Sequence, residues 1–306
     1  MPKLNVQQNN ANVIKALRNA LAIGQIKGPI ASDGADNFSS AGSNRNLLDN
    51  PWFGSGEVVN QRGNTSGTVN NAYFIDRWKL SGEYSIAASG ITFTCNAGAG
   101  VSQIFPRALT IGETYTFSVM YSDLSIVSCT FVPLANRENA YAFGDGLLLE
   151  IDTRAAYPTN RCIIYKNGSQ WTNEFRAFKL EKGTVSTLAN DTPPDYWQEL
   201  DKCLYYFERI KARGNYSSFG CGVAASATIA SILVPMHPKR NNSYTIATSG
   251  SFGVIGGTVT SMAKDNSSSN YALNLAVTGT FTSGAAALLR SQNDANAYID
   301  VNNDLQ

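Results

Sequence analysis

The chain has few of the residues on which enzymes commonly depend, since it contains one histidine, His237, among 306 residues. A Ser-His-Asp or Cys-His enzyme would have to use that histidine, and no nucleophile-elbow glycines or oxyanion loop accompany it. His237 lies instead between two prolines, in the turn-like segment Pro235-Met236-His237-Pro238. The sequence therefore predicts no catalytic residue of these classes, and we expect that the protein is not an enzyme.

Metal and redox motifs are also missing. The C-x-x-C spacing of zinc and redox sites does not occur among the five cysteines, Cys95, Cys129, Cys162, Cys203 and Cys221. An odd number excludes complete disulfide pairing, so we expect buried free thiols in a protein made in a reducing cytosol. Residues 293–296 and 302–304 have the Asn and Asp content of a calcium loop without its glycine and distal glutamate, and they are predicted to be solvated turns. No metal and no cofactor are expected.

Charge is scarce, because Asp, Glu, Lys and Arg make up 15% of the chain against the usual ~25%. The 24 basic residues nearly cancel the 23 acidic ones, which leaves no strong field for a nucleic acid or an anionic membrane. The sequence has no signal-peptide pattern and no apolar run near the ~18 residues of a membrane helix. We expect no nucleic-acid partner, no membrane insertion, and a surface that suits neutral ligands better than polyanions.

The first part of the chain, residues 1–45, is predicted to contain one short helix and a linker. Apolar residues recur at helical spacing over residues 8–24, and residues 28–46 are rich in Gly, Ser, Asn and Asp. A helix this short is marginal alone, so it needs something to pack against. We assign residues 1–45 to attachment or oligomerisation.

Residues 46–192 have the period of two that is typical of strands. Apolar and polar residues alternate over Ile91–Cys95 and Tyr115–Tyr121, and Phe175–Leu180 gives a further strand. Asn167-Gly168, after an apolar run, is a favoured hairpin dipeptide. Strands at this spacing, with turn signals and no intervening helix, predict a β-sandwich of the jelly-roll kind.

A connecting helix is predicted over residues 193–214. Pro193-Pro194 stops the sheet, Asp195 can cap the helix, and the pattern ends at Gly214. The apolar residues at helical spacing are Trp197, Leu200, Leu204, Phe207 and Ile210. Residues 215–306 return to short strands punctuated by glycine. The predicted fold class is all-β, with a jelly-roll-like sandwich and a second, smaller β domain joined by one helix, and a short N-terminal helix.

Several segments of the chain resemble phage tail-fibre and receptor-binding proteins, over residues 46–306. In that family an "NLLDN…NQRG…DRW" block opens a β-sandwich and a "KLE.G…KC..YFERI" block closes it and leads into a helix. Where the family usually has "KCQRYF", this chain has Lys202-Cys203-Leu204-Tyr205-Tyr206-Phe207. The matching residues are Asn46-Leu47-Leu48-Asp49-Asn50, Asn60-Gln61-Arg62-Gly63, Asp76-Arg77-Trp78, Lys179-Leu180-Glu181, Leu200, Cys203 and Tyr206-Phe207-Glu208-Arg209.

The resemblance implies a virion protein, made in the host bacterial cytoplasm, that recognises a host surface polysaccharide during adsorption. It also implies a homotrimer that contacts other virion proteins, of the tail, baseplate or capsid, through its N-terminal segment. In such an assembly Trp197, Tyr205 and Tyr206 would face neighbouring protomers as well as the core.

Shared motifs are expected to hold the sandwich together, because fibres that bind different hosts have them in common. This interpretation applies to Asp76-Arg77-Trp78 and to Asn60-Gln61-Arg62-Gly63, with Gly63 at a turn. Sugar contacts should then come from exposed rings in polar, loop-like stretches. The candidate ligand-binding residues are Tyr141, Tyr157 and Trp171.

Two alternative functions remain open. A polysaccharide depolymerase needs two carboxylates ~5 to 10 Å apart, and 23 acidic residues leave room for such a pair. Against it, phage depolymerases are typically long, repetitive β-helices, and this chain has no coil-length period. The other alternative is a structural appendage of the virion, such as a head fibre or baseplate component, without a ligand of its own.

Overall fold

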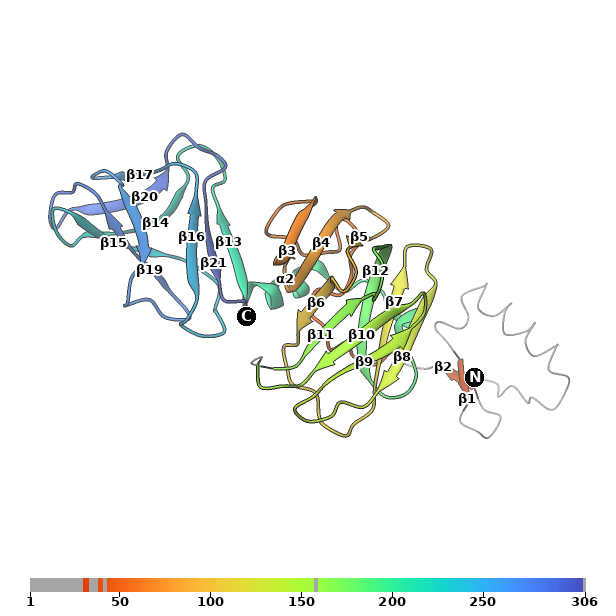
Figure 1. Ribbon diagram of the computed structural model, residues 1–306. Coiled ribbons are helices and arrows are strands. Elements are labelled where there is room, and N and C mark those ends of the chain that lie inside the picture. The colour runs from red at the N-terminus through yellow and green to blue at the C-terminus, as the bar shows by residue number, and fades with distance from the viewer. Residues whose placement is uncertain (1–29, 33–37, 41–42, 157–158, 305–306) are drawn as a thin grey trace, which may run out of the picture.

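The computed structural model describes residues 30–32, 38–40, 43–156 and 159–304. Within this part of the chain the structure consists of antiparallel sheets and one α-helix, α2 (Tyr196–Leu204). The predicted all-β fold class, with two β units joined by one helix, is confirmed. Figure 1 shows the larger unit and the smaller one, with α2 between them. The helix predicted over residues 8–24 lies outside the described residues.

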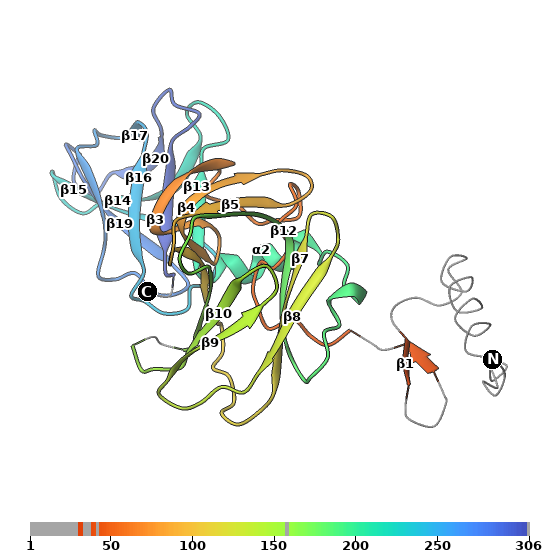
Figure 2. The ribbon, with the colours of Figure 1, turned by 45° about the vertical axis from the view of Figure 1, so that its right-hand side comes forward.

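Two short strands occur where the sequence predicted an irregular linker over residues 28–46. β1 (Ile30–Ser32) pairs antiparallel with β2 (Phe38–Ser40). Both lie apart from the two larger units (Figures 1 and 2). Strands of three residues are too short to display a period of two, so the pattern gave no sign of them.

The larger unit is built on one ten-stranded antiparallel sheet with the path β8-β7-β12-β5-β4-β6-β11-β10-β9, and β3 pairs with β4. The end strands β8 and β9 contact each other, so this single sheet curls nearly into a barrel around its core, where the sequence predicted a jelly-roll-like sandwich. The strands in this order are β8 (Ile126–Phe131), β7 (Tyr115–Tyr121), β12 (Trp171–Lys182), β5 (Ile91–Cys95), β4 (Trp78–Ile86), β6 (Gly100–Ile104), β11 (Arg161–Tyr165), β10 (Leu147–Asp152), β9 (Glu138–Phe143) and β3 (Ser66–Ile75).

The core of this unit is aromatic. Phe53 packs edge-to-face on Trp78 and Phe178, with ring centroids 5.6 and 4.8 Å apart. The apolar residues of β5 alternate into this core as predicted. In β7 the polar residues are buried as well, because segment 183–187 covers their face: Thr116 donates to the Gly183 carbonyl at 2.8 Å, and Ser118 bonds Ser186 at 2.7 Å.

The hairpin predicted at Asn167-Gly168 does not form. Gly168 does adopt a turn conformation with φ +79°, but the strands on either side of it do not pair with each other. β11 pairs with β6 and β10, whereas β12 pairs with β5 and β7. A turn dipeptide reverses the chain locally, while the curled sheet determines which edges are available for pairing.

Helix α2 is shorter than predicted. Asp195 caps it as expected, accepting hydrogen bonds from the amides of Trp197 and Gln198 at 3.0 and 3.1 Å. The helix ends at Leu204 and not near Gly214. The next segment forms strand β13 (Phe207–Lys211), because the distant strand β21 (Tyr298–Asn302) supplies its backbone partners. Trp197, expected on the apolar face, is 72% exposed.

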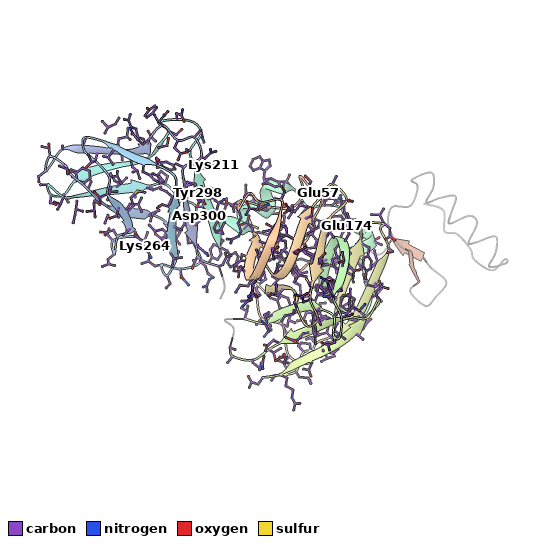
Figure 3. The ribbon with its side chains drawn as sticks, turned by 45° about the horizontal axis from the view of Figure 1, so that its top comes forward. Glu57, Glu174, Lys211, Lys264, Tyr298 and Asp300 are labelled. Atoms are coloured by element: carbon purple, nitrogen blue, oxygen red, sulfur yellow. The ribbon has the colours of Figure 1, made fainter. Side chains whose placement is uncertain are left out.

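The smaller unit packs a three-stranded sheet, β13-β21-β16, against a six-stranded sheet, β17-β20-β14-β15-β19-β18. Arg209 of β13 lies opposite Asp300 of β21 and binds its carboxylate at 2.7 and 2.8 Å, and Lys211 lies opposite Tyr298 (Figure 3). The remaining strands are β14 (Ser218–Ala224), β15 (Ile229–Val234), β16 (Thr245–Ser249), β17 (Phe252–Ile255), β18 (Ser261–Lys264), β19 (Leu273–Thr278) and β20 (Ala286–Ser291).

The cysteines are free thiols, as predicted. Cys95, Cys162 and Cys203 are buried, and burial raises the pKa of the Cys95 thiol to about 12. The expectation of burial is wrong for Cys221, which is exposed because alternation along β14 places its side chain on the outer face of the six-stranded sheet.

The two units meet at Arg62. Its guanidinium binds Asp304 and stacks 3.9 Å over the Phe207 ring, both of them from the smaller unit. Gln61 donates to the Phe207 carbonyl at 2.9 Å, and Arg209 donates to the Arg62 carbonyl at 2.6 Å. Gly63 follows with φ +84°, so the predicted turn is present. The Asn-Gln-Arg-Gly segment therefore serves as a joint.

Buried Asp76 makes the stability of this joint depend on pH. Burial raises the pKa of Asp76 from 3.8 to about 7, and nearby Asp304 adds to the rise, while the Gln61 amide and Arg62 oppose it. The carboxyl of Asp76 stays protonated to higher pH in the folded protein than in the unfolded chain. The contribution of protonated Asp76 to the free energy of unfolding is therefore complete below pH 3.8 and is lost as pH rises through about 7.

We expect Asp76→Asn to remove this dependence. The melting temperature of the unchanged protein, minus that of the variant, should fall as pH rises from about 4 to about 7. Thermal unfolding followed by circular dichroism at several pH values measures it. Asp294→Asn is the control, because backbone amides lower the pKa of this exposed carboxyl and its effect belongs below that window. A difference that stays constant with pH for Asp76→Asn would contradict the expectation.

Candidate functional site

A pocket of about 520 Å³ lies where the start of the larger unit meets the end of α2. Segment 45–49 forms one wall, Pro106-Arg107 another, and the C-terminal turn of α2 the third. Its lining combines aliphatic, aromatic and charged side chains. The lining residues are Arg45, Asn46, Leu47, Leu48, Asp49, Pro106, Arg107, Asp201, Lys202, Tyr205 and Tyr206.

The two tyrosines of the pocket are adjacent in the chain, directly after the last residue of α2, but they differ in exposure. Tyr205 is the C-cap residue of α2 and is 42% exposed, whereas Tyr206 is 6% exposed. Their rings pack edge-to-face with centroids 5.4 Å apart. Tyr206 is thus buried in the wall, while the ring of Tyr205 is partly exposed at the pocket.

Beneath the pocket lies a buried ion pair. Arg77 donates from Nε to Asp49 at 3.0 Å and from Nη2 to the Ile104 carbonyl at 2.8 Å. Its guanidinium stacks 3.6 Å from the Tyr206 ring. Arg77 is 1% exposed and adopts φ +71°, a left-handed conformation that costs energy for a residue with a side chain. Three directed contacts hold it there.

The neighbouring backbone is held just as closely. The Asp49 amide donates to Gln103 at 3.0 Å, and the Asn50 amide donates to the buried Glu199 of α2 at 3.0 Å. The Asn50 side chain donates to the Asp76 carbonyl, and Trp78 Nε1 donates to the Asn50 carbonyl, both at 2.8 Å. The Asn-Leu-Leu-Asp-Asn and Asp-Arg-Trp segments therefore bind each other, and together they fix the pocket wall against α2.

The rim of the pocket carries unpaired charges. Within the part of the chain that the structure describes, the exposed side chains of Arg45, Arg107 and Asp201 make no hydrogen bond or ion pair. Lys202, by contrast, is paired with Glu199. Unpaired guanidinium and carboxylate groups beside an exposed ring are suited to bind a polar ligand that also has an apolar face.

Two of the residues predicted to contact a ligand, Tyr141 and Trp171, do not line this pocket. Tyr141 of β9 is half-buried, stacks near Phe131 with centroids 5.3 Å apart, and donates to the Val132 carbonyl at 3.3 Å. Trp171 of β12 is 4% exposed and donates to the Ala99 carbonyl at 3.1 Å. The expectation of an exposed ring is therefore wrong for Trp171, because its side chain enters the core. Tyr157 lies outside the described residues.

The sequence signal for the pocket was partly present. Trp197, Tyr205 and Tyr206 were expected to face neighbouring protomers as well as the core; in the single chain Tyr206 is buried, whereas Trp197 and Tyr205 are exposed. Arg107 and Arg45 had no signal of their own, because isolated arginines in polar segments are ordinary surface residues. Only folding brings residues 45, 107 and 205 together.

His237 takes part in an ion cluster. Its Nδ1 lies 2.8 Å from Glu208, which also accepts from the buried Lys239 at 2.6 Å. Asp294 accepts from the backbone amides of Ser251 and Asn296, as a turn residue does. The prediction of a solvated turn is wrong for residues 302–304, because Asn302 belongs to β21 and both Asn303 and Asp304 are buried. Among the described residues, no group of three or more His, Cys, Asp and Glu side chains could hold a metal ion.

Two carboxyl groups, those of Glu138 and Glu150, lie on the adjacent strands β9 and β10. Burial, followed by the side chain of Glu138, raises the pKa of Glu150 to about 7. Arg154 pairs with Glu138, and Arg161 lies 3.4 Å from Glu150. This cluster has the geometry of a surface ion network.

No protein-family model, curated protein or solved structure matches this chain. Among the described residues, no helix has the length and apolar character needed to cross a membrane.

The buried ion pair under the pocket should be sensitive to a change of shape at constant charge. In Arg77→Lys, the ammonium group cannot bind Asp49 and the Ile104 carbonyl while it also stacks on Tyr206. We expect the free energy of unfolding in urea to fall by about 2 kcal/mol or more. The matched change at the rim, Arg107→Lys, should stay within about 0.5 kcal/mol. Equal effects of the two changes would mean that Arg77 is not the support of the wall.

Proposed function

We propose that the protein is a phage fibre or receptor-binding protein that recognises a host surface glycan for adsorption. The observation that carries this proposal is the pocket, whose lining includes the half-exposed Tyr205 ring together with Arg107 and Asp201, two charged side chains that have no partner among the described residues. Sugar-binding sites join an aromatic ring, which stacks on a pyranose face, to charged or amide groups that bind hydroxyls. The resemblance of the motifs around the pocket to phage fibres points the same way.

Self-association is the second part of the proposal. Ile255, Leu288, Cys221 and Leu233 lie directly opposite one another across β17, β20, β14 and β15, so they share the outer face of that sheet. Ile255 and Leu233 are 51% and 50% exposed. The adjoining row, Ala263, Ala276, Ser231, Val223 and Ala286, is uncharged. Such a face can meet other copies of itself without charge repulsion, which supports the homotrimer.

The two alternative functions, a structural appendage and a depolymerase, require other features of the molecule. A structural appendage would have no use for the unpaired groups of the pocket, and it would bind only other virion proteins through residues 1–45. A depolymerase would need two free carboxyls beside the saccharide, whereas of the two acids that line the pocket, Asp49 and Asp201, the first is bound to Arg77. Binding with no change in the saccharide therefore separates the proposed function from both.

Binding of the purified protein to an array of bacterial surface glycans tests the proposal. We expect retention on a subset of saccharides, with no shortening of the bound chains. Tyr205→Ala should lower the affinity by about tenfold or more, because the stacking surface is lost. Tyr271→Ala is the control, since that ring is 68% exposed and lies in the smaller unit. Silence of the whole array would favour a structural appendage, and shortened saccharide would favour a depolymerase.

The subunit association can be tested separately. Leu233→Lys places a charge at the β15 end of the apolar row, so we expect the trimer to dissociate to monomers at micromolar protein concentration. Light scattering after size-exclusion chromatography measures the mass. Val185→Lys is the control, because Val185 is 68% exposed on the larger unit. A monomeric unchanged protein, or a trimer that survives Leu233→Lys, would show that this face does not join the subunits.

A further inference from the structure

The pocket gathers several charged side chains, which the small net charge of the whole chain does not indicate. The formal net charge of the protein is +1, which favours neutral ligands. The pocket is lined by two acids and three bases: Asp49, Asp201, Arg45, Arg107 and Lys202. Asp49 is bound to Arg77, and Lys202 is bound to Glu199. Within residues 30–32, 38–40, 43–156 and 159–304, the charges of the pocket that have no partner are therefore two guanidinium groups and one carboxylate.

We infer that the ligand of this pocket is an anionic saccharide, with a carboxylate or phosphate group held by Arg45 and Arg107. This inference rests on the proposed function and names the class of glycan. A guanidinium group offers paired N–H donors that match the two oxygens of a carboxylate or phosphate. Tyr205 stacks on the sugar ring, and Asp201 accepts from its hydroxyls.

The volume of the pocket and the negative charge of Asp201 argue against a long polyanion as the preferred ligand. A volume of about 520 Å³ lies within the range of about 300 to 1,000 Å³ for small-molecule sites, so the pocket encloses a short stretch of a glycan. Asp201 on the rim repels a chain that is charged at every unit. A saccharide with one acidic group among neutral hydroxyls satisfies both the arginines and the aspartate.

A neutral sugar fits the same groups less well. It would stack on Tyr205 and bind Asp201, but it would leave both guanidinium groups next to hydroxyls that carry no charge. Charge-assisted hydrogen bonds are roughly twice as strong as neutral ones, so the arginines distinguish an acidic unit from its neutral counterpart. The contribution should weaken in salt, because both arginines are exposed.

The test uses the whole protein and three probes: an oligosaccharide that contains glucuronic acid, the same oligosaccharide with its carboxyl reduced to an alcohol, and a phosphate-substituted oligosaccharide. Calorimetry measures the affinities. We expect the acidic probes to bind at least about tenfold tighter than the reduced one. Which acidic probe binds more tightly identifies the source of the charge as carboxylate or phosphate.

Arg107→Gln and Arg45→Gln should each weaken the acidic probes and leave the reduced probe unchanged. Arg213→Gln is the control, since it removes the same charge from an exposed site in the smaller unit. Equal binding of the acidic and reduced probes, with loss of both in Tyr205→Ala, would overturn the anionic preference and leave the proposed function standing. If the protein bound the acidic probes tightly but did not compete with phage adsorption, the anionic preference would stand and the proposed function would be overturned.

Discussion

The buried ion pair between Arg77 and Asp49 is the interaction on which the described structure depends most. Removing two charges from water costs several kcal/mol, and the cost is offset only where geometry and further hydrogen bonds are complete. Here the Ile104 carbonyl and the Tyr206 ring supply two further contacts, while Nη1 of Arg77 is buried without a hydrogen-bond partner among the described residues. Arg77 is also in a left-handed conformation, so these contacts offset the cost of the backbone strain as well as part of the desolvation cost.

That requirement connects the fold to the pocket. Asp49 belongs to the first wall, Tyr206 to the last turn before β13, and Arg77 to the turn between β3 and β4. Asn50 adds a bond to Glu199 within α2. The walls of the pocket are thus formed by segments that are bonded to the larger unit and to α2. Its exposed side chains, Tyr205 and Arg107, can be substituted without a change in the core.

The joint between the two units also depends on a buried arginine, but the charge of the carboxyls around it changes with pH. Arg62 has two buried carboxyls as neighbours, Asp76 and Asp304, and burial raises the pKa of both. One arginine does not neutralise two carboxylates in a site of low dielectric, so protonation of one of them relieves the joint. The stability of the connection between the two units therefore depends on pH.

The sequence by itself determined the fold class, the alternation of β5, and the cap at Asp195, because each depends on neighbours along the chain. It also marked Asp76-Arg77-Trp78 as structural. Tertiary structure decided the rest: β13 became a strand because β21 lay beside it, Trp171 entered the core, and the Asn167-Gly168 turn joined strands with other partners. The candidate site is of this second kind, because its charges are far apart in sequence and meet only in the folded chain.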